Sequence, residues 1–161
     1  MKIAVILARS KSKRVIKKNI KIFCGKPIIA WPILAARKTK IFDRIIVSTD
    51  DKKIAKIARK YKADTPFLRP AKLADDFAET SEVVVHAINW LKNHGEHPSS
   101  VCCLYATSAF AKPADITQAY NLLNLGKSIC QTGIADKTLM IGSLIFSIVG
   151  NDKIDIMKAD V

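Results

Sequence analysis

The stretch KIAVILARSKSKRVIKKN, from Lys2 to Asn19, joins an apolar run to a strongly basic one. Its first half is almost continuously apolar, as is typical of a strand that is covered on both faces. The part from Arg9 to Asn19 carries six Lys or Arg residues and no acidic residue. A buried strand that ends in a basic loop predicts an anion-binding loop at the edge of a parallel sheet, because ligands sit beyond the carboxyl ends of such strands.

Downstream of this stretch, apolar β-rich runs alternate with segments of helical spacing. We expect strands over residues 2–8, 44–49 and 100–106, helices over residues 26–40, 50–62, 80–95 and 112–126, and a short extended piece over residues 63–68. Strand–helix–strand repetition implies right-handed crossovers. The sequence therefore predicts an α/β fold, with a mostly parallel sheet and helices on both faces. Beyond Gly126 the pattern is apolar and β-like but predicts no clear topology.

Local signals predict where the helices begin. Pro27 suits a first helical position, whereas Pro32 lacks a backbone donor and should kink or delay the same helix. Polar side chains before an apolar run are typical N-caps. The candidates are Thr49 or Asp50 for the second helix and Thr80 or Ser81 for the third.

The bulk composition is that of a globular domain. The chain has 161 residues, of which 49% are hydrophobic and 25% charged, and we expect a single domain over residues 1–161. No apolar run approaches the roughly 18 to 20 residues that span a bilayer, so we expect a cytoplasmic protein without a membrane partner. The four cysteines lack zinc-site spacing and are interpreted as buried free thiols, with Cys102 and Cys103 facing opposite sides of a strand.

The net charge of +13 is distributed unevenly, because the first acidic residue is Asp43. Such a field attracts anions. The loop after the first strand has neither the Walker P-loop pattern nor a glycine-rich dinucleotide fingerprint. Three interpretations stay open from charge alone: a site for a nucleotide polyphosphate, a nucleic-acid surface, and a merely solvated basic loop. Nucleic acid is disfavoured because no helix-turn-helix or RNA-module signature is present.

Three longer stretches carry a family resemblance. They are IAVILARSKSKRVIKKNIKIFCGKPIIAW, FDRIIVSTDDKKIAKIARKY and PFLRPAKLADDFAETSEVVVHAI, and Ala8 to Asn19 fits the pattern A-R-x-x-S-K-x-x-x-x-K-N. The chain resembles the acylneuraminate cytidylyltransferases, which activate nonulosonic acids. Tyr105-Ala106 stands where sialic acid enzymes carry Gln-Pro, so the chain is most similar to the pseudaminic acid branch. The likeness covers about residues 2–127, and the family-like part is expected to break off after about residue 127.

The resemblance implies a Rossmann-like nucleotidyltransferase fold and an enzyme of cell-surface glycan biosynthesis. Such enzymes transfer CMP from CTP to the anomeric hydroxyl of a nine-carbon keto-sugar acid, here pseudaminic acid or sialic acid, and release pyrophosphate. They use magnesium, for which no ligands are identified here, and form homodimers. By resemblance, Arg9 and Lys18 are the catalytic residues, which hold the triphosphate and neutralise its developing charge. The nucleotide-binding residues implied are Ala8, Ser12, Lys13, Arg14, Asn19, Arg69, Thr107 and Ser108.

Several departures and alternatives accompany these assignments. The family's two loop glycines are replaced by Ser10 and Lys11, its loop proline by Ile16, and a later proline by Ala109. Glycine lets a backbone approach phosphate closely, so the side chains of Ser10 and Lys11 are expected to narrow or strain this loop, with added charge from Lys11 as the alternative. A copy that binds nucleotide without turnover therefore stays open as an alternative function. Each candidate also has a structural explanation. Asp50 and Asp51 fit helix capping, Arg69 a loop anchor, Thr107 and Ser108 a capped turn, and His86 core packing.

Overall fold

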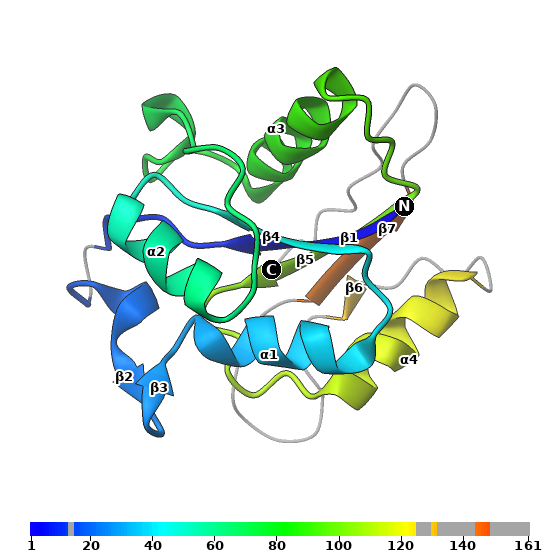
Figure 1. Cartoon of the computed structure of the whole chain (residues 1–161), viewed down its shortest axis with the longest axis horizontal. Helices are drawn as coiled ribbons and strands as arrows, with labels where there is room; N and C mark the ends of the chain where they lie inside the picture. Colours follow the sequence, from blue (N-terminus) through cyan, green and yellow to red (C-terminus); the bar gives the residue numbers. More distant parts are fainter. Residues whose placement is uncertain (13–14, 125–129, 132–143, 149–161) are drawn as a thin grey trace.

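The computed structural model describes residues 1–12, 15–124, 130–131 and 144–148, which are coloured in Figure 1. The chain forms seven strands, four α-helices and two short 3₁₀ turns in this part. The strands are β1 Lys2–Leu7, β2 Ile22–Phe23, β3 Lys26–Pro27, β4 Arg44–Ser48, β5 Ser100–Tyr105, β6 Cys130–Gln131 and β7 Leu144–Ile148. The helices are α1 Ala30–Thr39, α2 Lys52–Lys60, α3 Thr80–Asn93 and α4 Pro113–Asn124, with the turns η1 Lys18–Ile20 and η2 Ala71–Leu73.

The main sheet has the strand order β4-β1-β5-β7-β6. Strand β1 lies between β4 and β5 and runs parallel to both, so that Ile6 is level with Val47 on one side and Leu104 on the other. Strand β7 pairs antiparallel with β5, and β6 pairs antiparallel with β7. The predicted, mostly parallel α/β sheet is confirmed. A single bridge between Ile46 and Asp64 extends its edge with the expected extended piece.

Helices cover both faces of the sheet, as the alternation of β1 requires. Ala4, Ile6 and Ala8 pack on the face that α1, α2 and α4 cover. Ile3 and Val5 pack with α3 on the other face. Figure 1 shows α3 on one side of the strands and the pair α1 and α4 on the opposite side. Because both faces are buried, β1 needs apolar side chains at every position.

The predicted helix over residues 26–40 begins later than expected. Pro27 is wrong as a first helical position, because it belongs to the small hairpin of β2 and β3. Between these strands Cys24 and Gly25 both have positive φ, 47° and 80°, as a two-residue hairpin turn requires. Helix α1 begins at Ala30, so Pro32 lies in its first turn, where a missing backbone donor costs little. Pro32 therefore delays the helix, which confirms that expectation.

The helix caps differ from those the sequence predicts. Asp51 caps α2 by accepting hydrogen bonds from the backbone N–H of Lys53 and Ile54, so Thr49 and Asp50 are wrong as caps. Helix α3 begins with a reciprocal capping box of Glu79 and Glu82 instead of Thr80 or Ser81. In both helices an acidic side chain meets the positive end of the helix dipole. Asp50 is consequently not needed as a cap and has another contact.

Cys102 and Cys103 are buried on opposite faces of β5, as predicted, and burial raises the pKa of the Cys103 thiol to about 12. The prediction of a buried thiol is wrong for Cys24, which is exposed in the hairpin turn. Cys102 and Cys103 are buried because helices cover both faces of β5, whereas Cys24 is exposed because it lies at the tip of a hairpin.

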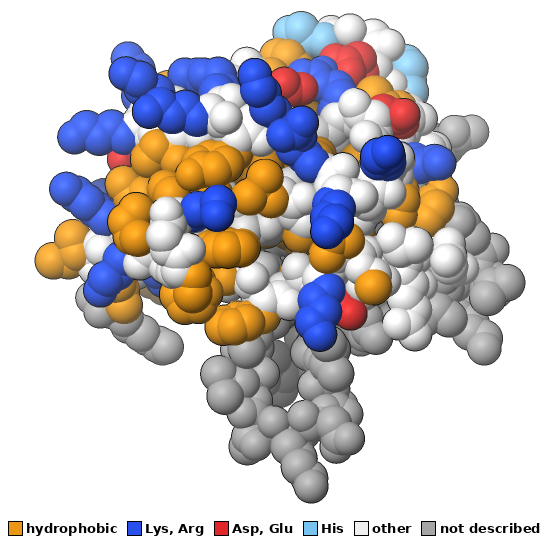
Figure 2. Space-filling model, turned by 60° about the horizontal axis from the view of Figure 1, so that its bottom comes forward, with side chains coloured by type: hydrophobic (Ala, Val, Ile, Leu, Met, Phe, Trp, Pro, Cys, Tyr) orange, Lys and Arg blue, Asp and Glu red, His pale blue; other side chains and the backbone are white. Residues whose placement is uncertain are grey.

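The positive surface is spread beyond the expected loop. The outer face of α2 exposes Lys52, Lys53, Lys56 and Lys60 around an apolar inner face. Figure 2 shows Lys and Arg side chains along the edge of an area of apolar side chains on the face that includes α1. Part of the positive net charge therefore lies on an ordinary solvent-exposed helix face. No helix in the described part of the chain is long and apolar enough to cross a membrane.

His86 lies in α3 with its ring edge-on to Phe67 at 4.8 Å between centroids, and its Nδ1 is buried without a hydrogen-bond partner in the described structure. Burial lowers the pKa of His86, and the charges of Arg69 and Lys72 lower it further. Core packing is therefore the interpretation that the contacts favour.

This environment makes the free energy of unfolding depend on pH. The unfolded chain takes up the His86 proton near pH 6.5, before the folded chain does, so stability falls as the pH drops below about 6.5. We expect His86→Phe to lose part of this decline between pH 7 and 5.5 in urea titrations. The exposed His97→Gln variant is the control and should keep the wild-type slope; an unchanged slope in His86→Phe would contradict the assignment.

Candidate functional site

The loop after β1 is fixed by contacts that start at its first residues. Ala8 is fully buried and donates its backbone N–H to the Ser48 carbonyl at 3.0 Å. Asn19 is buried, and its Nδ2 donates to the Arg9 carbonyl at 2.8 Å. Asn19 thus ties the end of the loop back to its beginning.

The Arg9 side chain reaches across the site to the segment before α3. Its Nη1 donates to the Asp75 carbonyl at 2.7 Å and pairs with the Asp76 carboxylate at 2.6 Å. About a third of each side chain of this ion pair is exposed. A guanidinium held this way has further donors that a phosphate can reach.

Ser10 makes two bonds to one carboxylate. Its backbone N–H donates to Asp50 Oδ1 at 2.7 Å, and its hydroxyl donates to Asp50 Oδ2 at 2.5 Å. Asp50 directly follows β4 and Thr49, so this pair joins the loops after two neighbouring parallel strands. The loops at the carboxyl ends of these two strands therefore meet through specific contacts.

Arg69 is buried and bonded mainly to β4. Its Nη2 donates to the Ser48 carbonyl at 2.5 Å, its Nε to the Ser48 hydroxyl at 3.1 Å, and its Nη1 to the Leu73 carbonyl at 3.4 Å. Burial lowers the pKa of Arg69 to about 10, with Asp50 opposing and Arg9 reinforcing the shift, so it stays protonated near neutral pH. The contacts support an anchoring role, and Arg69 also lines the cleft described next.

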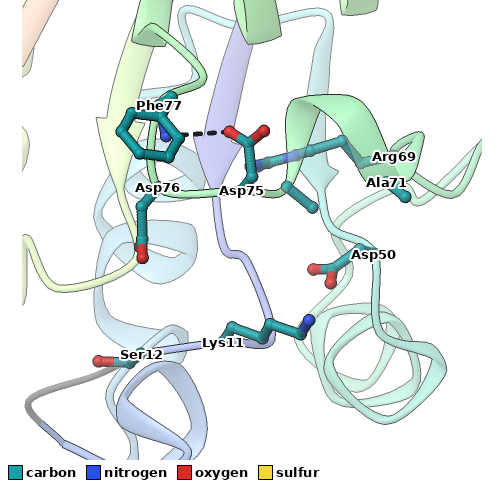
Figure 3. Close-up of a pocket in the computed structure, with 9 residues that line it drawn as sticks. Lys11, Ser12, Asp50, Arg69, Ala71, Asp75, Asp76 and Phe77 are labelled. Atoms are coloured by element: carbon teal, nitrogen blue, oxygen red, sulfur yellow. Dashed lines mark hydrogen bonds between the residues drawn. The ribbon is translucent and has the colours of Figure 1, made fainter.

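A cleft opens beyond the ends of β1 and β4 (Figure 3). Its larger hollow has a volume of about 720 Å³ and a smaller one about 250 Å³. Both hollows are lined by Lys11, Arg69, Asp75 and Asp76, so they form two compartments of one cleft. A space of this size accommodates a small-molecule ligand. Figure 3 shows Lys11 and Ser12 on one side of the space and Asp75, Asp76 and Phe77 on the other.

The cleft brings together most of the residues that the sequence marks. Ser12 lines the larger hollow, and the smaller one is lined by Arg9, Lys18, Asn19 and Thr107. Ser108 is buried in the adjoining turn, where its N–H donates to the Tyr105 carbonyl and its hydroxyl has no partner in the described structure. It is not among the lining residues, so the contacts favour a structural role. Lys13 and Arg14 lie outside the described residues.

Three aspartates and one tyrosine of the cleft were not predicted as site residues. Asp50 was interpreted as a helix cap, and Asp75 and Asp76 were not singled out. The Tyr105 hydroxyl is hydrogen-bonded to the Thr80 hydroxyl at 2.8 Å in the smaller hollow. The position of Asp50 directly after a buried strand was the available signal. The cleft is consequently of mixed charge, unlike the purely cationic cradle that the loop sequence suggests.

The acidic side chains of the cleft bear on whether it can hold magnesium. No group of three or more His, Cys, Asp or Glu side chains could hold a metal ion within the part of the chain that the structure describes. Asp50 already accepts from Ser10, and Asp75 accepts from the N–H groups of Phe77 and Ala78. The described residues thus provide no ready-made set of three or more such ligands, whereas Mg²⁺ at nucleotide sites is usually held by one or two carboxylates together with substrate phosphates. Asp152 and Asp155 lie outside them.

The fold is that of nucleotidyltransferases. The structure is similar to a CMP-2-keto-3-deoxy-manno-octonic acid synthetase complexed with CTP, with a TM-score of 0.65 and 18% identity over 80% of this chain and 49% of that one. It is also similar to 4-diphosphocytidyl-2C-methyl-D-erythritol synthase from Anaerococcus prevotii, with a TM-score of 0.56 and 17% identity over 97% and 64%. These likenesses establish the Rossmann-like nucleotidyltransferase fold.

Over residues 3–138 the chain matches the cytidylyltransferase family, and it belongs to that family. It is 42% identical to the pseudaminic acid cytidylyltransferase of Campylobacter jejuni over 73% of this chain and 51% of that protein. It is 38% identical to the CMP-N,N′-diacetyllegionaminic acid synthase of Legionella pneumophila over 79% and 55%. An N-acylneuraminate cytidylyltransferase of Escherichia coli is 37% identical over 74% and 27%. The chain thus spans between about a quarter and just over half the length of these relatives.

Proposed function

We propose that the chain is a cytidylyltransferase that transfers CMP from CTP to a nonulosonic acid and releases pyrophosphate. Pseudaminic acid is the favoured acceptor and sialic acid the second. The observation that carries the proposal is the cleft beyond β1 and β4, which is lined by the cations Arg9, Lys11, Lys18 and Arg69 in a chain that belongs to this family. The name of the Campylobacter relative supports the choice of acceptor.

The chemistry suits such a cleft. The anomeric hydroxyl oxygen of the acceptor bonds to the α-phosphorus of CTP, and pyrophosphate leaves. This displacement depends on aligning two polyanionic reactants and on stabilising charge on the phosphate oxygens. Arg9 would bind the phosphates, Ser12 would donate from its hydroxyl, and Lys18 would neutralise the leaving charge. The nucleotide site would be completed by Ala8, Asn19, Thr107 and the loop residues Lys13 and Arg14.

The direct test is a pyrophosphate-release assay with CTP and magnesium and with either pseudaminic acid or sialic acid. Release with pseudaminic acid well above that with sialic acid is the expected result. A CTP-dependent rise in melting temperature without release would instead support a nucleotide-binding protein without turnover. The proposal would be contradicted if CTP caused neither a rise in melting temperature nor release of pyrophosphate.

Homodimer formation and a cytoplasmic location belong to the same proposal. The relatives' names say nothing of assembly, so the oligomeric state needs its own measurement. Sedimentation of the purified chain at several concentrations, with and without CTP, would show whether it dimerises. A monomer at all concentrations would remove the dimer from the proposal and leave the reaction untouched.

A further inference from the structure

We propose that Asp50 is a positioning residue for the nucleotide site, which holds the loop after β1 in its binding geometry through Ser10. The inference rests on the proposed function for its ligand. The observation behind it is the pair of bonds from the Ser10 N–H and hydroxyl to the two carboxylate oxygens of Asp50, at 2.7 and 2.5 Å. Asp50 was singled out by the sequence only as a possible cap, which the structure assigns to Asp51.

Asp50 is a suitable brace because its own position is fixed. It directly follows β4 and the buried Thr49. The next residue, Asp51, is the N-cap of α2, and its backbone N–H donates to Thr49 Oγ1 at 3.2 Å. A strand end and a helix start thus hold Asp50 on both sides. Groups built on rigid elements position a site more precisely than groups on free loops.

The loop needs such a brace. No glycine occurs between Ala8 and Asn19, so the loop does not rely on glycine geometry. Asn19 holds Arg9 by its carbonyl, and Asp50 holds the next residue, Ser10. Lys11 and Ser12, which follow immediately, line the larger hollow. Two adjacent residues held from two directions leave little freedom at the point where the chain enters the site, and a loop ordered before binding loses less entropy on binding.

The charge of Asp50 argues for this positioning role over direct contact with the ligand. Asp50 lines the larger hollow, where a carboxylate repels a polyphosphate. Figure 3 shows the Lys11 side chain extending toward Asp50 and Arg69 on the adjacent wall. A carboxylate that costs binding energy at a phosphate site is explained by what it holds in place. The hydrogen bonds therefore matter more than the negative charge.

The experiment compares four variants in CTP titrations and in amide hydrogen exchange of residues 7–12. Asp50→Ala should bind CTP about 10-fold more weakly and expose the Ser10 amide to exchange, because two charge-assisted bonds are lost. Asp50→Asn can still accept from the Ser10 N–H and should restore both readouts to near wild type. Ser10→Ala should have a smaller effect, and Ser10→Ala with Asp50→Ala should be no weaker than Asp50→Ala alone.

Asp51→Ala is the matched control, because it removes the adjacent carboxylate and the cap of α2. It should lower the melting temperature but leave CTP affinity and Ser10 exchange unchanged. The proposal is overturned if Asp50→Ala behaves like Asp51→Ala in these readouts. It is also overturned if Asp50→Asn is as weak as Asp50→Ala, which would assign the effect to charge.

The failures of the two proposals can be told apart. If the wild-type chain does not bind CTP, the proposed function fails, while the exchange of the Ser10 amide still decides whether Asp50 fixes the loop. If Asp50→Ala does not fold, Ser10→Ala tests the same contact from the other side. Unchanged Ser10 amide exchange together with unchanged CTP affinity in Ser10→Ala would then refute the brace.

Discussion

The Arg9→Ala variant is expected to bind CTP about 100-fold more weakly than the wild-type chain, since it loses a bidentate, charge-assisted phosphate contact. Arg9 lies at the mouth of the smaller hollow, and its backbone is fixed by Asn19. The change should act on affinity with little effect on stability, because the Arg9 side chain is one-third exposed. Calorimetric titration with CTP measures the first and thermal unfolding the second.

In the chain without nucleotide, the Arg9 side chain is already paired with Asp76. This pairing allows the CTP affinities of Arg9 and Asp76 variants to be compared. The Asp76 carboxylate, which pairs with Arg9 at 2.6 Å, competes with a phosphate for the guanidinium and repels the phosphate's negative charge. Asp76→Asn should therefore bind CTP several-fold more tightly, the opposite direction from Arg9→Ala. Lys38→Ala, which removes an exposed charge from the last turn of α1, is the matched control for net charge. Equal losses in Arg9→Ala and Lys38→Ala would mean that only the overall field matters.

Arg69→Ala is expected to have the largest effect on stability, a loss of about 3 kcal/mol in the free energy of unfolding. The substitution leaves the Ser48 hydroxyl without its buried donor, takes one of two donors from the Ser48 carbonyl and removes the link to Leu73. For a chain of this size the melting temperature should fall by roughly 10 °C. Urea titration followed by circular dichroism measures the loss.

Arg69→Lys separates anchoring from charge. Lysine keeps a positive charge in the cleft but cannot reproduce the planar fork that joins Ser48 and Leu73. We expect it to recover less than half of the lost stability and to bind CTP better than Arg69→Ala. Full recovery of stability would show that charge alone is required. A loss below about 0.5 kcal/mol in Arg69→Ala would place the guanidinium outside the anchor.

Local pattern was sufficient for the parallel strands β1, β4 and β5 and for most helices, but not for the antiparallel β6 and β7. The unbroken apolar run of β1 can be buried only by cover on two faces, and the helical spacing of Ile54, Ala58 and their neighbours leaves α2 one way to pack. Pro32 correctly indicated a delay of α1 by its missing donor, whereas Pro27 misled, because a proline at a hairpin edge and a proline at a helix start satisfy the same local rule.

The site was predicted less completely, because it depends on contacts between distant segments. The basic loop could be recognised in the sequence by its charge. Asp50 and Ser10, however, are 40 residues apart in sequence and meet only because β1 and β4 are neighbours. Asp75 and Asp76 enter the site through a loop that reaches Arg9 across 66 residues or more. No periodicity reports such pairings. The mixed charge of the cleft could therefore be known only from the folded chain.

The most direct test of the account compares the affinities of the wild-type chain for CTP, CDP and CMP in one buffer at fixed ionic strength. If the loop after β1 and the residues facing it bind a triphosphate, affinity should fall by about 10-fold or more with each phosphate removed, because each takes away charge-assisted hydrogen bonds. Equal affinities for the three nucleotides, or no binding of any, would contradict a phosphate-binding cleft at the carboxyl end of this sheet.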